Sequence, residues 1–256
     1  MLFRSSLCWD KAQSANMWAD WYRRYWWEKS SESPITAEKL KWVANGKESV
    51  IVKPLSSSEG VGIYASDISS EEMLQKAVDQ INRIDAAQII EERIVQSGLL
   101  HDLNPSSVNT CRMITARHAD GEIELVCTYL RLGGTELVVD NFSAGGVQYV
   151  IDKNTGTLGI GTDLHGNCYT VHPASGKTVT GINIPNWQNA VEFCFSAHRH
   201  APAGLVLAGW DVCISDDGMS LVEVNSRPGF CQLFNESEDH WKSIKGLLDE
   251  ADRKRQ

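Results

Sequence analysis

Residues 209–229, near the C-terminus, have the pattern of a β-hairpin. Two runs with alternating apolar residues flank an Asp-Asp-Gly turn at 216–218, which is typical of two antiparallel strands. Side chains alternate between the faces of a strand, so Glu223 and Asn225 share a face. Asp211 lies in the first strand, where it can pair roughly opposite them.

Two carboxylates and an amide that meet at one place form an all-oxygen site of the kind that magnesium prefers. The same spacing is equally compatible with an ordinary hairpin whose polar residues face water. The Ser-Arg-Pro-Gly sequence after Asn225 ends the second strand abruptly and offers backbone amides beside the carboxylates. The hairpin therefore raises the question of whether the chain also supplies a nucleotide site.

Residues 48–54 form an apolar strand that contains Lys53 near its end, followed by a Ser/Gly-rich loop and a further strand. Backbone N–H groups in such a loop can approach an anion closely, and the lysine adds positive charge. The loop is not a Walker loop, because no Gly-Lys-Ser/Thr follows its glycines. A purely structural turn is an equally good interpretation of this segment alone.

The composition excludes several classes of protein. The chain has 256 residues, of which 42% are hydrophobic and 22% charged, as in a soluble protein with a sizeable core. Its net charge of -9 argues against general nucleic-acid binding. Seven scattered cysteines without a Cys-x-x-Cys pair indicate reduced thiols. No apolar run predicts a signal peptide or a membrane span, so we expect a cytoplasmic protein.

The N-terminal region is rich in aromatic residues. Trp18, Trp21, Tyr22 and Tyr25 follow helical spacing, which predicts a helix with an aromatic face. Packing of this face against the body of the protein is the simpler interpretation, and a docking patch for a partner is the alternative.

The remaining pattern interleaves helices with strands that are mostly joined as hairpins, which favours the α+β class. We predict helices at 36–42, 71–83, 187–200 and 237–254, and strands at 87–95, 109–116, 122–131, 136–139 and 147–152. Residues 157–186 are predicted to be mainly loop.

Four blocks, in order, resemble the ATP-grasp superfamily, and most closely its sugar-transfer-associated family. They are Val50-Ile-Val-Lys53-Pro54 with the Ser/Gly loop, Ile89-Ile-Glu91-Glu92-Arg-Ile94, Val108-Asn109-Thr110-Cys-Arg112-Met-Ile-Thr115, and Gly209-Trp-Asp211 through Glu223-Val-Asn225-Ser-Arg-Pro-Gly229. The resemblance covers roughly residues 48 to 235 and implies two α+β subdomains with ATP between them. The expected division is an aromatic-rich segment 1–47, an N-terminal subdomain 48–90 and a C-terminal subdomain 91–256.

The resemblance implies a set of residues for ATP. Lys53 would contact the α- and β-phosphates, and the loop that folds over them contains Ser57, Gly60 and Gly62. The strand that follows this subdomain would be the hinge for adenine, which is read by the Glu91 side chain, the Glu92 carbonyl and the Ile94 amide.

The resemblance also implies roles in the reaction. The residues Asp211, Glu223 and Asn225 would hold two magnesium ions on the β- and γ-phosphates. Arg112 would stabilise charge on the transferred phosphoryl group. The residues expected to face the acceptor are Asn141, Ser143, Gly145, Gly146 and Arg227.

The implied activity is that of an ATP- and Mg²⁺-dependent carboxylate-amine ligase in polysaccharide or related metabolite biosynthesis. A carboxylate or sugar-derived acceptor is activated as an acyl phosphate, which an amine or similar nucleophile then attacks. A kinase of a sugar-like acceptor and a non-catalytic nucleotide-binding scaffold are the alternatives. We expect no nucleic-acid partner; the Trp-rich N-terminal segment is a candidate contact for a homo-oligomer or a partner chain.

Overall fold

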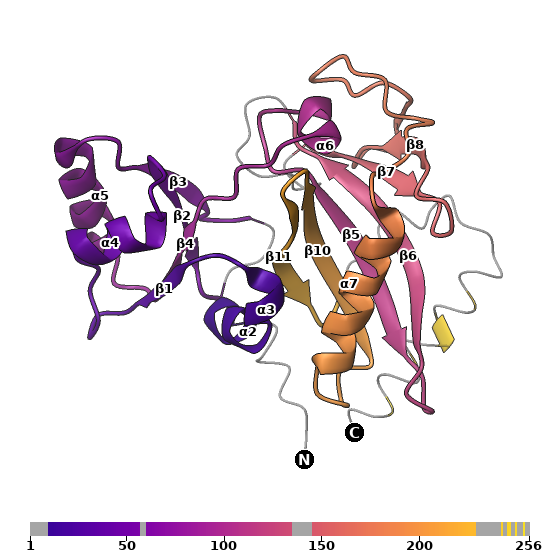
Figure 1. Ribbon diagram of the computed structural model, residues 1–256, viewed down its shortest axis with the longest axis horizontal. Helices are drawn as coiled ribbons and strands as arrows, with labels where there is room; N and C mark the ends of the chain where they lie inside the picture. Colours follow the sequence, from indigo (N-terminus) through magenta and orange to yellow (C-terminus); the bar gives the residue numbers. More distant parts are fainter. Residues whose placement is uncertain are drawn as a thin grey trace. The chain divides into compact units, whose positions relative to one another are not determined.

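The computed structural model describes residues 10–56, 60–134 and 145–228, together with isolated positions between 242 and 253. They fall into two compact units, which divide between residues 95 and 96. Each unit contains an antiparallel sheet with helices (Figure 1), which confirms the predicted α+β class. The division into 1–47, 48–90 and 91–256 stays a prediction. The first compact unit contains residues 10–47 together with 48–95.

The first unit has a four-stranded sheet in the order β1-β4-β2-β3. Its elements are α2 (Lys11–Met17), α3 (Ala19–Tyr22), β1 (Trp26–Lys29), α4 (Ala37–Ala44), β2 (Ser49–Pro54), β3 (Tyr64–Asp67), α5 (Glu71–Arg83) and β4 (Gln88–Glu92). The N-caps Thr36 and Ser70 start α4 and α5 by accepting hydrogen bonds from the amides of Lys39 and Met73. The helix predicted at 71–83 is therefore confirmed.

Helices cover both faces of this sheet. Apolar residues of α4 and α5, such as Leu40 and Ile81, pack with Val52 and Ile90 on one face. Residues of α2 and α3 pack with Ile89, on the other face. Because β4 is buried along its whole length, a polar side chain on it must find a partner within the unit.

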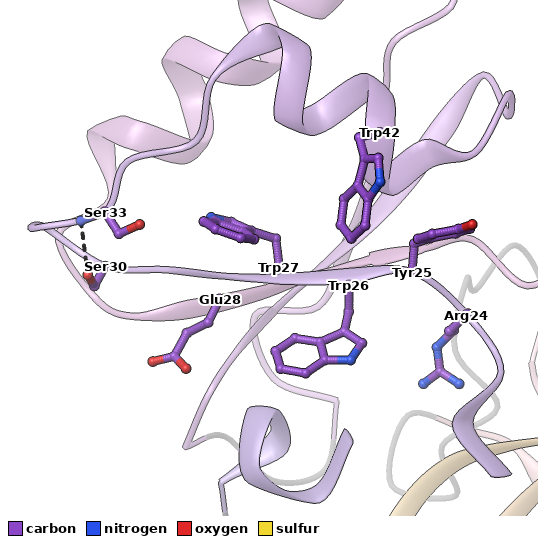
Figure 2. A pocket seen from close by; sticks show the side chains of 8 residues that line it. All are labelled: Arg24, Tyr25, Trp26, Trp27, Glu28, Ser30, Ser33 and Trp42. Atoms are coloured by element: carbon purple, nitrogen blue, oxygen red, sulfur yellow. Dashed lines mark hydrogen bonds between the residues drawn. The ribbon is translucent and has the colours of Figure 1, made fainter. Parts of the chain in front are cut away.

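The helix predicted through the N-terminal aromatic residues is wrong beyond Tyr22. Arg23 adopts a left-handed conformation (φ 53°) and ends α3. The chain then forms β1, where Trp26 and Trp27 point to opposite sides of the strand (Figure 2). The helical spacing failed because pairing of β1 with β4 outweighed the local preference.

The second unit has a seven-stranded antiparallel sheet in the order β11-β10-β5-β6-β7-β8-β9. Its elements are α6 (Leu99–Leu103), β5 (Thr110–Arg117), β6 (Ile123–Leu132), β7 (Val147–Ile151), β8 (Leu158–Thr162), β9 (Cys168–Tyr169), α7 (Trp187–His200), β10 (Leu207–Ser215) and β11 (Gly218–Asn225). The helix predicted at 187–200 is confirmed.

Helix α7 crosses one face of this sheet, over β5, β6 and β10 (Figure 1). The Sγ of Cys194 lies 3.3 Å from the Sδ of Met113. Thr115 Oγ1 lies 2.7 Å from His198 Nδ1 and accepts a 2.7 Å hydrogen bond from Trp210 Nε1. Because side chains alternate along a strand, Arg112 and Asp211, which adjoin Met113 and Trp210 in sequence, point to the opposite face.

Other predictions have mixed outcomes. The segment 157–186 contains the short strands β8 and β9, which were not predicted. The strand at 136–139 lies outside the described residues, as does most of the helix at 237–254. Within the described part of the chain, no helix is long and apolar enough to span a bilayer.

Candidate functional site

The hairpin predicted at 209–229 is formed by β10 and β11, and a bulge determines which side chains meet. Near the turn, Ser215 pairs with Gly218 and Val212 with Leu221, but Asp211 pairs with Glu223. The register therefore shifts by one residue at Val222. Directly paired residues in antiparallel strands share a face, so the bulge brings Glu223 to the face of Asp211.

Asp211 lies at the centre of a charged cluster on that face. Its carboxylate is 1% exposed and accepts hydrogen bonds on both oxygens from Arg112, which also lies directly opposite it on β5. Arg131, on β6, places Nη2 2.8 Å from Asp211 Oδ2. One buried carboxylate thus holds two guanidinium groups.

The cluster is fixed by further contacts and charges. Thr110 Oγ1 accepts hydrogen bonds from Nε and Nη2 of Arg131, at 3.1 and 2.7 Å. Burial raises the pKa of Asp211, but Arg112 and Arg131 outweigh it and hold this pKa below its ordinary value. Burial lowers the pKa of Arg112, but Asp211 and, more weakly, Glu223 raise it above its ordinary value. Asp211 and Arg112 are therefore both charged at neutral pH.

The oxygen donors on this face fit magnesium in kind. Glu223 and Asn225 follow each other on one face of β11 and are both partly exposed. Asp211 Oδ2 contacts both arginines, whereas Oδ1 contacts Arg112 alone, which leaves Oδ1 an acceptor position for a cation. No cluster of three or more His, Cys, Asp or Glu occurs in the part of the chain that the structure describes, so a metal here would need the Asn225 amide.

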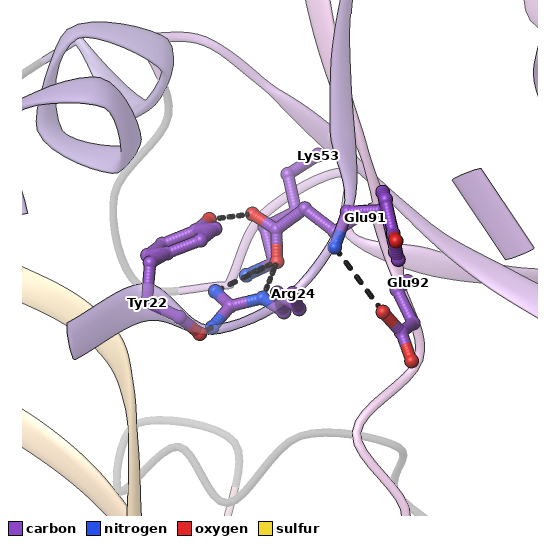
Figure 3. A network of polar contacts seen from close by, with 6 residues as sticks. Tyr22, Arg24, Lys53, Glu91 and Glu92 are labelled. Atoms are coloured by element: carbon purple, nitrogen blue, oxygen red, sulfur yellow. Dashed lines mark hydrogen bonds and ion pairs between the residues drawn. The ribbon is translucent and has the colours of Figure 1, made fainter. Parts of the chain in front are cut away.

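A second charged cluster lies in the first unit, around Glu91 on β4 (Figure 3). Glu91 Oε2 lies 2.9 Å from Lys53 Nζ and 3.0 Å from Arg24 Nη2. Its Oε1 accepts a 2.5 Å hydrogen bond from the Tyr22 hydroxyl. Two cations and one carboxylate leave a local excess of positive charge beside the Ser/Gly loop, which suits a phosphate.

The Glu91 carboxylate is strongly held in its ionised form. Burial raises its pKa, but Arg24, Lys53 and the Tyr22 hydrogen bond lower it to about 2. The side chain therefore orients Lys53. A contact of this side chain with adenine would require these bonds to break, so the structure favours a positioning role for Glu91.

Glu92 is held in a different way. Its carboxylate pairs with Lys47 and accepts hydrogen bonds from Asn45 Nδ2, at 3.3 Å, and from the Tyr25 amide, at 3.1 Å. Ile94 is half-buried in the segment that follows β4. The Glu92 carbonyl and the Ile94 amide remain predicted adenine contacts.

The other predicted residues are placed as follows. Gly60 and Gly62 have positive φ of 75° and 76°, and a Cβ on Gly62 would lie 2.9 Å from Pro54 Cγ, so a side chain there would be strained. Ser57, Asn141 and Ser143 lie outside the described residues. The residues of the acceptor prediction that are described are Gly145 in an exposed turn, Gly146 before β7, and Arg227, exposed after β11.

The sequence analysis did not identify Tyr22 and Arg24 as partners of Glu91. It also missed Arg131 and its hydrogen-bond acceptor Thr110. Arg131 could have been found only with the register of β5 and β6. Ala116 pairs with Glu124, but a bulge after Ile114 lets Thr110 pair with Arg131. Regular pairing would have placed Arg131 on the other face.

Solved structures show the same fold at low sequence identity. The D-alanine–D-alanine ligase from Bacillus anthracis has a TM-score of 0.56 at 14% identity, over 97% of this chain and 69% of the ligase. The ATP complex of that ligase gives 0.57 at 14% identity, over 97% and 67%. The ADP complex of PurK, an N5-carboxyaminoimidazole ribonucleotide synthetase, gives 0.54 at 14% identity, over 94% and 51%.

These similarities define the class: the chain has the fold of the ATP-grasp ligases. Residues 30–238 match the model of the sugar-transfer associated ATP-grasp family, and the chain belongs to that family. A comparison with curated proteins gives no match.

Proposed function

We propose that the protein is an ATP- and Mg²⁺-dependent ligase, active in the cytoplasm in polysaccharide or related metabolite biosynthesis. It would join an acceptor carboxylate to an amine or similar nucleophile. The observation that carries the proposal is the buried pair Arg112 and Arg131 on Asp211, on the same sheet face as Glu223 and Asn225. Membership of the ATP-grasp family supports it.

In the first step a carboxylate oxygen attacks the γ-phosphorus of ATP, and the bond to the β,γ-bridging oxygen breaks, which gives an acyl phosphate and ADP. In the second step an amine attacks the acyl carbon, phosphate leaves and the nitrogen loses a proton. Magnesium, when bound, neutralises charge on the β- and γ-phosphates.

This chain's residues act by position and charge. Glu91 holds Lys53 in place to bind the α- and β-phosphates. Asp211, Glu223 and Asn225 would hold the metal through side-chain oxygens. Because Asp211 holds Arg112 in place, the guanidinium does not have to move as the phosphoryl group is transferred. Ser57, Gly60 and Gly62 would belong to the loop over the phosphates. The acceptor would lie near Gly145, Gly146 and Arg227, together with the predicted contacts Asn141 and Ser143.

The test incubates the purified protein with Mg²⁺, ATP and a panel of sugar acids and amino acids, and measures ADP, phosphate and product. Phosphate release that depends on both a carboxylate and an amine supports the ligase. A phosphorylated sugar would instead show a kinase, and ATP binding without turnover a scaffold.

Substitutions test the assignment of the site. Glu223→Gln should lower turnover by at least about 100-fold and weaken Mg²⁺-dependent ATP binding. Glu124→Gln changes a half-exposed glutamate of β6 in the same sheet and should leave both unchanged. Near-normal turnover in Glu223→Gln would contradict the metal assignment.

A further inference from the structure

Strand β1 forms one edge of the four-stranded sheet. Its inner side pairs with β4, and within the described residues no strand pairs with its outer side. The Tyr25 carbonyl accepts a 2.8 Å hydrogen bond from the Glu92 amide. Backbone groups of successive strand residues point alternately to the two sides, so those of Trp26 and Glu28 point away from β4. Such an edge is a template for another strand.

A groove of about 600 Å³ follows this edge. It is lined by Arg24, Tyr25, Trp26, Trp27, Glu28, Ser30, Ser33 and Trp42. Figure 2 shows Tyr25 and Trp27 on one side of the strand and Trp26 and Glu28 on the other. A groove lined by consecutive residues of a strand runs along its backbone edge, and not across one face. Its shape therefore fits an added strand.

The aromatic residues of the groove are held in place but remain exposed. Lys39 Nζ lies 4.1 Å from the ring centroid of Trp27 and 4.7 Å from that of Trp42, within cation–π distance. Tyr25 meets Trp42 edge-on, with 4.9 Å between ring centroids. Nevertheless, Tyr25 and Trp42 are 42% and 48% exposed. Fixed, exposed aromatic side chains beside an open strand edge mark an association surface.

We propose that β1 pairs antiparallel with β1 of a second copy of this chain, about a twofold axis at Trp26. The aromatic sequence Tyr25-Trp-Trp27 is complementary to itself in this register. Trp26 faces the partner's Trp26, and Tyr25 faces the partner's Trp27. In this register the outward backbone groups of Trp26 and Glu28 meet the outward groups of the partner strand. The two four-stranded sheets then form one sheet of eight strands.

Self-complementarity selects a second copy over an unrelated strand. Each of the three central positions pairs one aromatic residue with another, which stabilises antiparallel strands. The Arg24 guanidinium stays on Glu91 within its own chain, so the aromatic pairs and the backbone carry the contact. A register centred on Trp27 would keep only one aromatic pair and would place Lys29 opposite Tyr25. Closed pairing of two copies also removes the open edge.

The oligomeric state of the full chain tests the proposal. Sedimentation velocity at about 1 to 100 μM should show a monomer–dimer equilibrium with a dissociation constant in the micromolar range. Glu28→Pro removes the outward N–H of this residue in both copies and should raise that constant at least about 10-fold. Glu28 is exposed and its N–H points away from β4, so the variant should fold, which circular dichroism checks. Glu28→Gln keeps the N–H and should leave the constant unchanged.

A monomer at every concentration, or equal constants for Glu28→Pro and the wild type, would overturn the proposal. A cysteine scan tests the register. Trp26→Cys should form a disulfide between two copies under mild oxidation, identified by peptide mapping without reduction. Efficient crosslinking of Trp27→Cys with none of Trp26→Cys would refute the Trp26-centred register. None of these measurements depends on ATP or on turnover, so their outcome is separate from that of the proposed function.

Discussion

Glu91 has the most strongly determined charge state of the predicted site residues. The carboxylate lies among Tyr22, Arg24 and Lys53, inside the first unit. A buried cation without a counter-charge costs several kcal/mol, so Glu91 is needed to hold Lys53 in place. The same contacts make the stability of the fold depend on pH.

The pKa of Glu91 is about 2 in the folded protein, against an ordinary 4.5. Because the folded value is lower, the carboxylate stabilises the fold above about pH 4.5, and this contribution is lost as the pH falls toward 2. It amounts to about 3 kcal/mol at neutral pH. We expect Glu91→Gln to unfold at lower urea concentration than the wild type at pH 7, and the difference in unfolding free energy to shrink by about half at pH 3.

The exposed Glu72 on α5, 77% exposed in a surface pair with Lys76, offers a matched control. Glu72→Gln should change the unfolding free energy by less than about 0.5 kcal/mol at either pH. A difference between Glu91→Gln and the wild type that stays constant from pH 7 to pH 3 would show that the contacts of Glu91 do not lower its pKa.

Gly209 determines how closely β10 approaches its neighbours. A Cβ at this position would lie 2.7 Å from Pro228 Cβ and 3.3 Å from Arg112 Cδ. The absence of a side chain thus leaves room for the Arg112 guanidinium beside Asp211. Gly209→Ala should lower the unfolding free energy by about 1 to 3 kcal/mol through overpacking, and should weaken ATP binding, measured by calorimetry with Mg²⁺.

Gly159 on β8 is the matched control in the same sheet. A Cβ there would meet nothing closer than Val150 O, at 3.5 Å, which is an ordinary contact. Gly159→Ala should therefore keep both stability and ATP affinity. Equal stability of the two variants would contradict the close approach at Gly209.

At the scale of elements, much of the fold was predictable where local signals are strong. Ser70 before two glutamates predicted α5, and the apolar spacing of 187–200 predicted α7, both as observed. The helix through Tyr25 failed because Arg23 turns left-handed and β1 gains a partner 65 residues away in Glu91, paired with Trp26. Long-range pairing has no local signature.

The residues of the candidate sites were also predictable from the sequence only in part. The sequence marks Lys53, Asp211 and Glu223 by residue type and by strand position. Asp211 was expected roughly opposite Glu223 and does pair with it, but through a bulge at Val222. The sequence does not mark Arg131, whose position depends on the bulge after Ile114. One extra residue moves all later side chains to the other face, and no feature of the sequence revealed where these bulges lie.

At the scale of the whole molecule, Lys53 and Glu223 belong to different units. The proposed function has both residues act on the same nucleotide. A ligand that binds only the folded state stabilises it by about 2.7 kcal/mol at 100 times its dissociation constant. ATP with Mg²⁺ should therefore raise the melting temperature of the wild type, and ATP with EDTA should raise it less.

Lys53→Met and Glu223→Gln should each remove most of this increase, although they alter different units. If both residues contact one nucleotide, the double variant should bind ATP with Mg²⁺ more weakly than either single variant, by up to the sum of the two losses of binding free energy. Lys76→Met and Glu124→Gln, one exposed residue in each unit, serve as controls and should keep the increase. An increase that survives unchanged in either Lys53→Met or Glu223→Gln would show that the hairpin and the lysine strand do not serve a common ligand.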